Sequence, residues 1–147
     1  MVSVSPRPQT QDPGCGNLLP MLKKAQARSH YVSPKFMAGT ADSLNLSVSD
    51  VYGISTFYSF LSTRPLGTNV IRVCKNLPCY LKGSELILKS IEDSIGIKPG
   101  ETTRDRKFSF ELVNCIGACD RAPAMLVNDE VHGNLTPRKI SKILQQY

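Results

Sequence analysis

The chain has 147 residues, of which 41% are hydrophobic and 20% charged, as expected of an ordinary globular protein with a real core. No apolar run approaches the roughly 18 residues of a membrane-spanning helix, which argues against membrane insertion. The net charge of +6 suggests nucleic-acid binding, but the basic residues are scattered along the chain rather than gathered on one stretch. That scatter disfavours nucleic acid and leaves an acidic partner or an anionic cofactor.

The beginning of the chain is rich in proline, glycine and polar residues. Residues 1–15 are predicted to form a flexible leader, and they lack the apolar stretch of a secretory signal peptide. We therefore expect a cytoplasmic protein, either free or peripheral to a membrane complex. In that reducing compartment, clustered cysteines more often bind metal or do redox chemistry than form disulfides. Cys15, remote from the other four cysteines, is interpreted as a spare thiol of the leader.

Residues 16–63 carry a helical pattern and are predicted to form an N-terminal segment of three helices. Leu18 and Leu22 belong to the apolar stripe of the first helix. Ser33 followed by Pro34 is a typical N-cap and first-turn pair, and it predicts the start of the second helix.

The third helix of this segment is predicted to begin at Ser47, with Asp50 completing a capping-box pattern. Its apolar positions continue to about residue 61. We interpret Phe57 and Tyr58 as core or partner-interface residues rather than as part of a cofactor site. The Arg-Pro-Leu-Gly sequence of residues 64–67 then ends the helical pattern.

After residue 68 the pattern changes to short β-branched strands separated by helices. The predicted elements are a strand over 70–74, a helix over 80–95, a strand over 108–115, a hairpin of 124–127 and 130–132, and a last helix after Pro137. A β-α-β unit requires parallel strands, and the β-β-α unit that follows is an antiparallel hairpin closed by a helix. The predicted fold class is therefore α/β: an N-terminal three-helix segment followed by a thioredoxin-like α/β sandwich.

Four cysteines fall into two pairs in this second part. Cys74 and Cys79 are separated by four residues, and Cys115 and Cys119 by three. Each pair begins where a predicted strand ends, and ligands of open α/β sheets gather at the carboxyl ends of strands. If the two strands are neighbours, all four sulfurs converge, and the sequence predicts a four-thiolate site.

The spacing bears on what such a site holds. Neither pair has the C-x-x-C spacing of a thioredoxin dithiol. Structural zinc usually takes closer pairs, although it stays open as an alternative. A 2Fe–2S cluster needs two thiolates at each of two irons, which suits wider pairs on two loops. The two histidines, His30 and His132, are far from both motifs, which disfavours a Rieske-type centre. Both are interpreted as surface residues.

The residues around the cysteines suit a negatively charged cluster. The helix predicted over 80–95 would direct its N-terminal dipole at the first pair, and Lys75 and Lys82 add positive charge. Pro78 is expected to hold the residue before it in an extended conformation. Gly117 is expected to let backbone N–H groups approach sulfur with no Cβ in the way.

Three stretches carry a resemblance to a known family: VYGISTFYSF (51–60), VCKNLPCYLKG (73–83) and NCIGACDRAPAMLVNDEVHGNLTP (114–137). They resemble the 24-kDa subunit of respiratory NADH dehydrogenase and its relatives in NAD(P)-linked hydrogenases and formate dehydrogenases. The resemblance implies one 2Fe–2S cluster bound by Cys74, Cys79, Cys115 and Cys119, in a ferredoxin domain over 68–147. The first loop reads KNLP where many relatives carry smaller residues, a departure that bears on the potential and exposure of the cluster.

The same resemblance implies a one-electron carrier without catalytic residues of its own. Its expected partners are a flavoprotein subunit, which binds FMN and NAD(P)H, and other iron–sulfur subunits of an oxidoreductase complex. The rival interpretation is a zinc-stabilised adaptor protein. Pro123 stands where thioredoxin-like folds often place a cis proline, and Asp120 with Arg121 forms either a solvated turn or an interface pair.

Overall fold

The computed structural model describes residues 15–147, so the predicted leader, apart from its last residue, lies outside the described residues. Cys15 is already the first residue of a helix, and the role of its thiol stays a prediction. The chain divides into two compact units, the first ending at Arg64 and the second comprising Pro65–Tyr147. Along the described residues, no helix combines the length and apolar character needed to span a membrane.

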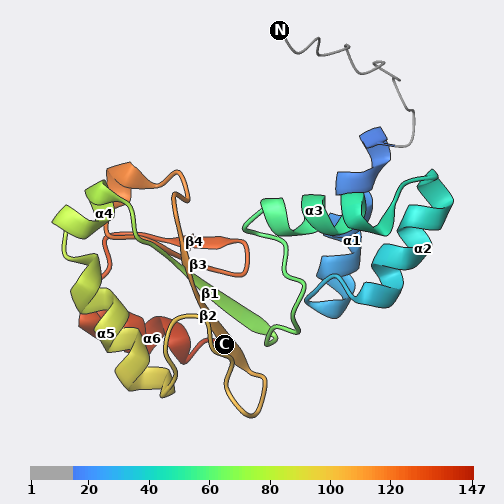
Figure 1. Cartoon of the computed structure of the whole chain (residues 1–147). Helices are drawn as coiled ribbons and strands as arrows, with labels where there is room; N and C mark the ends of the chain where they lie inside the picture. The colour runs from blue at the N-terminus through green and yellow to red at the C-terminus, as the bar shows by residue number, and fades with distance from the viewer. Residues whose placement is uncertain (1–14) are drawn as a thin grey trace, which may run out of the picture. The chain divides into compact units, whose positions relative to one another are not determined.

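The first unit is helical, as expected (Figure 1). Ser33 and Ser47 cap the second and third helices, since their hydroxyl oxygens accept hydrogen bonds from the backbone N–H groups of Phe36 and Asp50. Both predicted caps are thus confirmed. The helices are α1 (Cys15–Ser29), α2 (Pro34–Leu44) and α3 (Val48–Phe57). The buried core of this unit consists of Leu18, Leu22, Val32, Met37, Ala41 and Val51.

The end of α3 departs from the prediction. The helix stops at Phe57, about four residues early, and Tyr58 is extended. Phe57 is 80% exposed and Tyr58 42% exposed, so their interpretation as core residues is wrong and the interface interpretation remains. Phe57 follows Val51 by six residues, which places it about a third of a turn away from that buried residue around the helix.

The second unit is built on a four-stranded sheet of order β2-β1-β3-β4. As predicted, β1 and β2 are parallel, and β3 pairs with β1 and β4 in antiparallel fashion. The second strand ends at Val113, two residues before the predicted Cys115, so Cys115 lies on the loop. The strands are β1 (Asn69–Cys74), β2 (Phe108–Val113), β3 (Met125–Val127) and β4 (Glu130–His132).

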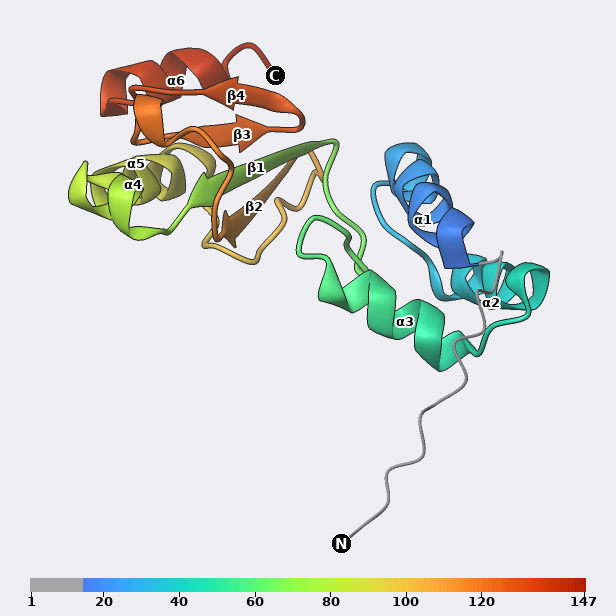
Figure 2. The same ribbon diagram turned by 90° about the horizontal axis from the view of Figure 1, so that it is seen from above.

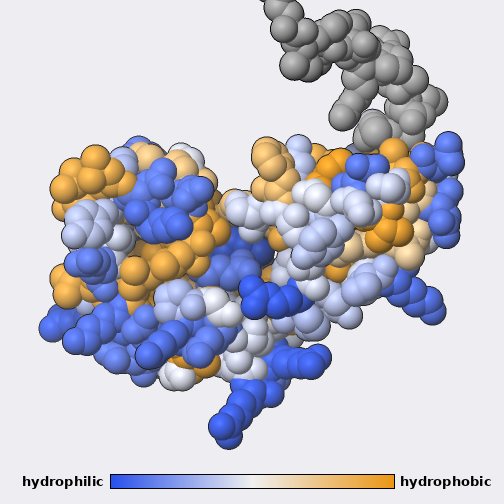
Figure 3. Space-filling model, viewed as in Figure 1, coloured by the Kyte–Doolittle hydropathy of each residue, from blue (hydrophilic) through white to orange (hydrophobic). Residues whose placement is uncertain are grey.

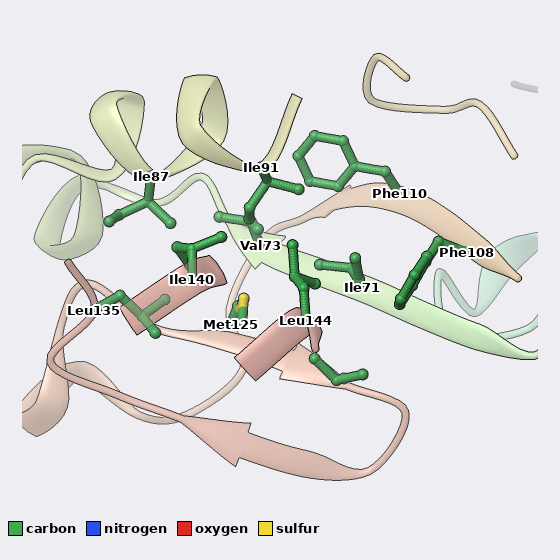
Figure 4. Packing of buried hydrophobic residues seen from close by; sticks show 11 residues of the cluster. Ile71, Val73, Ile87, Ile91, Phe108, Phe110, Met125, Leu135, Ile140 and Leu144 are labelled. Atoms are coloured by element: carbon green, nitrogen blue, oxygen red, sulfur yellow. The ribbon is translucent and has the colours of Figure 1, made fainter. Parts of the chain in front are cut away.

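Helices α5 (Ser84–Ile95) and α6 (Pro137–Leu144) pack together against one face of this sheet (Figures 1 and 2). Alternate strand residues point to this face and form the buried core with the two helices (Figure 4). In β1 these residues are Ile71 and Val73. Residues Val70, Arg72 and Cys74 therefore lie on the opposite face of the sheet.

The helix predicted over 80–95 is in fact two helices. A short helix, α4 (Leu77–Leu81), precedes α5, and Gly83 separates them with a φ of +85°. A left-handed residue ends a helix, and glycine adopts that conformation without steric cost. Leu77 is the first residue of α4, so the expectation that Pro78 keeps it extended is wrong. Pro78 lies in the first turn, where its missing N–H has no helical partner to lose.

Candidate metal centre

The first cysteine pair is buried in regular structure. Cys74 is the last residue of β1 and Cys79 lies within α4, and each is 1% exposed. The Sγ atom of Cys74 donates a hydrogen bond to the Asn114 carbonyl oxygen at 2.9 Å. This bond ties the first pair to the segment that leaves β2 toward the second pair.

The second pair lies on an exposed loop. Cys115 and Cys119 are both exposed, and Cys119 begins the short 3-10 helix η1 (Cys119–Arg121). The Gly117 N–H donates to Cys115 Sγ at 3.4 Å. Gly117 has a φ of +77°, and a Cβ atom there would meet nothing within 4 Å. The expected reason for glycine, clearance near sulfur, is therefore wrong: the backbone conformation requires it.

The sheet brings the two pairs to the same edge. Strands β1 and β2 are parallel neighbours, and Cys74 is aligned with Val113 at their carboxyl ends. The chain segments that carry the pairs therefore leave the sheet side by side. This is the arrangement that the cysteine spacing predicts.

The pKa shifts of two thiols show that the four cysteines interact. Burial is the main cause that raises the pKa of Cys79, and the neighbouring Cys74 and Cys119 raise it further, while a backbone hydrogen bond from Ala124 lowers it. The pKa of Cys119 is raised chiefly by its hydrogen bond with Cys115 and by the charge of that thiol, with burial and Cys74 contributing less. The pKa values of Cys79 and Cys119 thus respond to the other thiols of the site.

The two thiol pairs supply the four cysteine ligands that a 2Fe–2S cluster or a structural zinc ion requires. Across residues 15–147, no three His, Cys, Asp or Glu side chains are grouped closely enough to hold one metal ion. The four thiols are free of disulfides. A 2Fe–2S cluster takes two thiolates at each iron, whereas structural zinc takes all four around one centre. Metal binds thiolates rather than thiols, so a metal that occupies the site must displace protons from its cysteines.

The surroundings of the pairs differ from expectation in one respect. The N-terminus of a long helix does not follow the first pair, because Cys79 itself lies inside the five-residue α4. Lys75 and Lys82 are exposed on either side of this helix.

The peptide bond between Ala122 and Pro123 is cis, which confirms the prediction for Pro123.

The loop of the second pair is fixed by a contact that the sequence analysis missed. A Cβ atom at Gly133 would lie 2.5 Å from the Arg121 Cβ, and the Asn134 N–H donates to the Arg121 carbonyl oxygen at 2.6 Å. Only glycine allows this approach, which holds η1 against the segment that leads to α6. Arg121 also pairs with Asp120 at 3.5 Å, with both side chains more than half exposed, as in a solvated turn.

Neither histidine lies in the cysteine segments. His30 is exposed, as expected, whereas His132 is half-buried with its Nε2 atom 3.3 Å from the Tyr147 hydroxyl. Arg72 and Glu111 form a partly buried ion pair between β1 and β2, with 2.9 Å between Nε and Oε2. Sequence analysis missed this pair because the two residues meet only through the register of the strands.

Comparison with known proteins gives one family and several relatives. The family model for thioredoxin-like 2Fe–2S ferredoxins matches residues 9–147. The chain is 36% identical over 126 residues to one of the subunits of the NADH-quinone oxidoreductase of Pseudomonas aeruginosa, covering 86% of this chain and 76% of that protein. It is 33% identical over 132 residues to the HndA protein of the NADP-reducing hydrogenase of Solidesulfovibrio fructosivorans, covering 90% of this chain and 77% of that protein.

A solved structure shares the fold. The crystal structure of an NAD+-reducing NiFe-hydrogenase in the air-oxidized state aligns with a TM-score of 0.77 and 21% identity. The alignment covers 88% of this chain and 22% of the hydrogenase chain, so this chain corresponds to a small part of that protein. The paired thiols at the ends of adjacent strands, the cis proline and the family match over nearly the whole sequence agree: the chain belongs to the thioredoxin-like 2Fe–2S ferredoxin family.

Proposed function

We propose that this chain is a one-electron carrier subunit in which Cys74, Cys79, Cys115 and Cys119 bind its 2Fe–2S cluster. The observation that carries the proposal is the arrangement of two interacting thiol pairs at the carboxyl ends of adjacent parallel strands. Each pair would hold one iron. The family to which the chain belongs uses this cofactor, and its donor set here consists entirely of cysteine.

The chain's own groups would hold the cluster and adjust its charge. When bound, a 2Fe–2S cluster accepts and releases a single electron. Backbone hydrogen bonds from Gly117 to Cys115 and from Ala124 to Cys79 favour negative charge on sulfur. The burial of Cys74 and Cys79 keeps water from one side of the site, while the exposed Cys115 and Cys119 leave the other side open for electron exchange.

The electron donor or acceptor would be a flavoprotein subunit that binds FMN and NAD(P)H. The relatives support this assignment, since they are named as subunits of an NADH-quinone oxidoreductase and of an NADP-reducing hydrogenase. A flavin that takes a hydride must pass its two electrons on singly, which a one-electron cluster permits. The proposed setting is the cytoplasm, free or peripheral to a membrane complex, with further iron–sulfur subunits in the same assembly.

The start of α4 and α5 offers a surface for that partner. Four large apolar side chains of α4 and the start of α5 are exposed: Leu77, Tyr80, Leu81 and Leu86, which we call the α4 surface. Hydrophobic surface is visible over this part of the molecule (Figure 3). Lys75 and Lys82 flank it and are exposed as well. An apolar centre with a charged rim is typical of an interface, and the basic rim suits an acidic rim on the partner. Docking there would bring the partner next to Cys79.

Reduction by nicotinamide tests the proposal. The purified chain, loaded with its cluster under anaerobic conditions, is mixed with NADH or NADPH, with and without the FMN-containing subunit from the same genome. The cluster spectrum should bleach only when the flavoprotein is present. Reduction of the cluster without the flavoprotein, or no bleaching when a fully active flavoprotein is added, would contradict the proposed role.

A further inference from the structure

We propose that the partly buried Arg72–Glu111 ion pair sets the reduction potential of the cluster, with the arginine raising it and the glutamate lowering it. The inference rests on the proposed function, and specifically on Cys74 as a cluster ligand. Neither residue is proposed to touch the cluster. They would act on it through their charges.

The alternation of β1 places Arg72 beside the site. Ile71 and Val73 point into the core beneath α5 and α6, so Arg72 and Cys74 share the opposite face of the strand. Residues two apart on a strand are separated by about 7 Å. Arg72 therefore lies on the same face as Cys74 and one side-chain step away from it.

The register of the sheet adds Glu111 to this face. Arg72 is aligned with Glu111 of β2 on one side and with Leu126 of β3 on the other. The Nε–Oε2 distance is 2.9 Å, and the side chains are 7% and 25% exposed. Leu126, the residue aligned with Arg72 on β3, is an apolar residue that is 8% exposed. The two charges are thus fixed by strand pairing and largely removed from water.

Burial strengthens the electrostatic interaction between these charges and the cluster. Reduction adds one electron to the cluster and forms or breaks no bond, so a neighbouring cation stabilises the reduced state and a neighbouring anion destabilises it. In a medium less polar than water, such an interaction is stronger than at the surface and is screened less by salt.

Stability alone is a weak reason for an ion pair at this position. Buried ion pairs often contribute little more than apolar side chains of the same size, because both charges must be desolvated. The adjacent positions of β1 and β2 on this face are occupied by Val70, Ser109 and Val113. A charged pair among such residues, next to a ligand of a negatively charged group, points to an electrostatic role.

The test is the midpoint potential of the cluster in Arg72→Gln and Glu111→Gln, measured by anaerobic redox titration followed by EPR on the full chain. Arg72→Gln should shift the potential to more negative values, and Glu111→Gln should shift it to more positive values. Arg72→Lys keeps the charge and should restore most of the wild-type potential. Opposite signs are decisive, because a general loosening of the site would move both variants in the same direction.

Lys75→Gln is the matched control. It removes one positive charge on the other side of Cys74, but from an exposed side chain. Its shift should be smaller than that of Arg72→Gln and should vanish when the salt concentration is raised from about 0.05 to about 1 M, since the Debye length then falls to about 3 Å. The shift of Arg72→Gln should persist at high salt.

The inference is overturned if both variants shift the potential in one direction, or by no more than Lys75→Gln does, while their melting temperatures fall. The pair would then be a structural link between strands. Should Arg72→Gln not hold the cluster, Glu111→Gln keeps the side-chain shape and carries the test with its opposite sign. A wild-type chain without a 2Fe–2S signal would instead contradict the proposed function itself.

Discussion

The two cysteine segments of this protein are built on opposite principles. Cys74 and Cys79 are buried and belong to a strand and a helix, whereas Cys115 and Cys119 are exposed on a loop shaped by Gly117. Even their pKa shifts have different first causes, burial for Cys79 and the neighbouring thiol for Cys119. The first segment thus supplies two buried cysteines fixed by regular structure. The second supplies two exposed cysteines whose loop is held by contacts with the neighbouring backbone.

Removing one cysteine from each segment is expected to have the largest effect on the cluster. Cys79→Ala and Cys119→Ala should both abolish the EPR signal of the reduced cluster. Only Cys79→Ala should also lower the free energy of unfolding of the metal-free chain, by about 1 kcal/mol, because it removes a buried side chain. Cys119→Ala should change it by less than about 0.5 kcal/mol.

Cys15→Ala is the control for this experiment, because its thiol is predicted to take no part in the site. It should retain the full signal. A Cys119→Ala variant that keeps a wild-type 2Fe–2S spectrum would show that the exposed segment is not half of the site.

A change on the α4 surface should weaken partner binding without disturbing the first cysteine segment. Leu81 is 73% exposed, so Leu81→Ser should leave the fold and the cluster spectrum unchanged. Its loss from a partner interface should weaken binding of the flavoprotein about tenfold, which corresponds to roughly 1.4 kcal/mol. Calorimetry or surface plasmon resonance with the FMN-containing partner measures this.

Leu112→Ser makes the same change at another exposed leucine, on the edge strand β2. Its affinity for the partner should stay at the wild-type value. Equal affinities of the two variants would place the docking surface elsewhere.

The second segment should depend on one backbone conformation. Gly117→Ala places a Cβ on a residue with a φ of +77°, which costs about 1 kcal/mol. The cluster should be lost several-fold faster on exposure to a chelator, followed by its visible absorbance.

Gly53→Ala is the matched change inside α3, where a Cβ meets nothing within 4 Å. It should stabilise the first unit slightly and leave the rate of cluster loss unaltered. If Gly117→Ala loses its cluster no faster than Gly53→Ala does, the loop is held by other residues.

The smallest expected effect is on the pH dependence of stability, and it arises at Tyr147, outside both cysteine segments. The Tyr147 hydroxyl donates to Glu130 Oε2 at 2.7 Å, and this hydrogen bond, with burial, raises the pKa of Tyr147 above its ordinary value of 10.0. A raised pKa means that the contribution to stability is complete below pH 10 and is lost as the pH rises beyond it. Denaturant titrations from about pH 9 to about pH 11 should show a fall in stability that is smaller in Tyr147→Phe.

Much of the fold follows from local patterns. The caps at Ser33 and Ser47, the alternation in β1 and β2 and the hairpin around Asn128 were predictable because each depends on residues close in sequence. The position of each cysteine pair after a predicted strand also predicted that both pairs lie at one edge of the sheet, and β1 and β2 are indeed parallel neighbours.

The failures arise where tertiary contacts or a single dihedral angle overrule the pattern. Gly83 lies within the helix predicted over 80–95, yet its left-handed conformation divides that helix in two. Phe57 fits the apolar period of α3 but faces solvent. The Arg72–Glu111 pair and the approach of Gly133 to Arg121 join residues far apart in sequence, and no local rule can find them.

Metal and sulfide analysis decides whether the four cysteines hold a 2Fe–2S cluster. Iron, zinc and acid-labile sulfide are counted per chain in anaerobically purified protein, and EPR spectra are recorded before and after reduction with dithionite. We expect two iron and two sulfide per chain, no signal when oxidised and a rhombic S = 1/2 signal when reduced, as a 2Fe–2S cluster with four thiolates gives. One zinc per chain, without sulfide and without a signal even after reconstitution with iron and sulfide, would contradict the electron-carrier account.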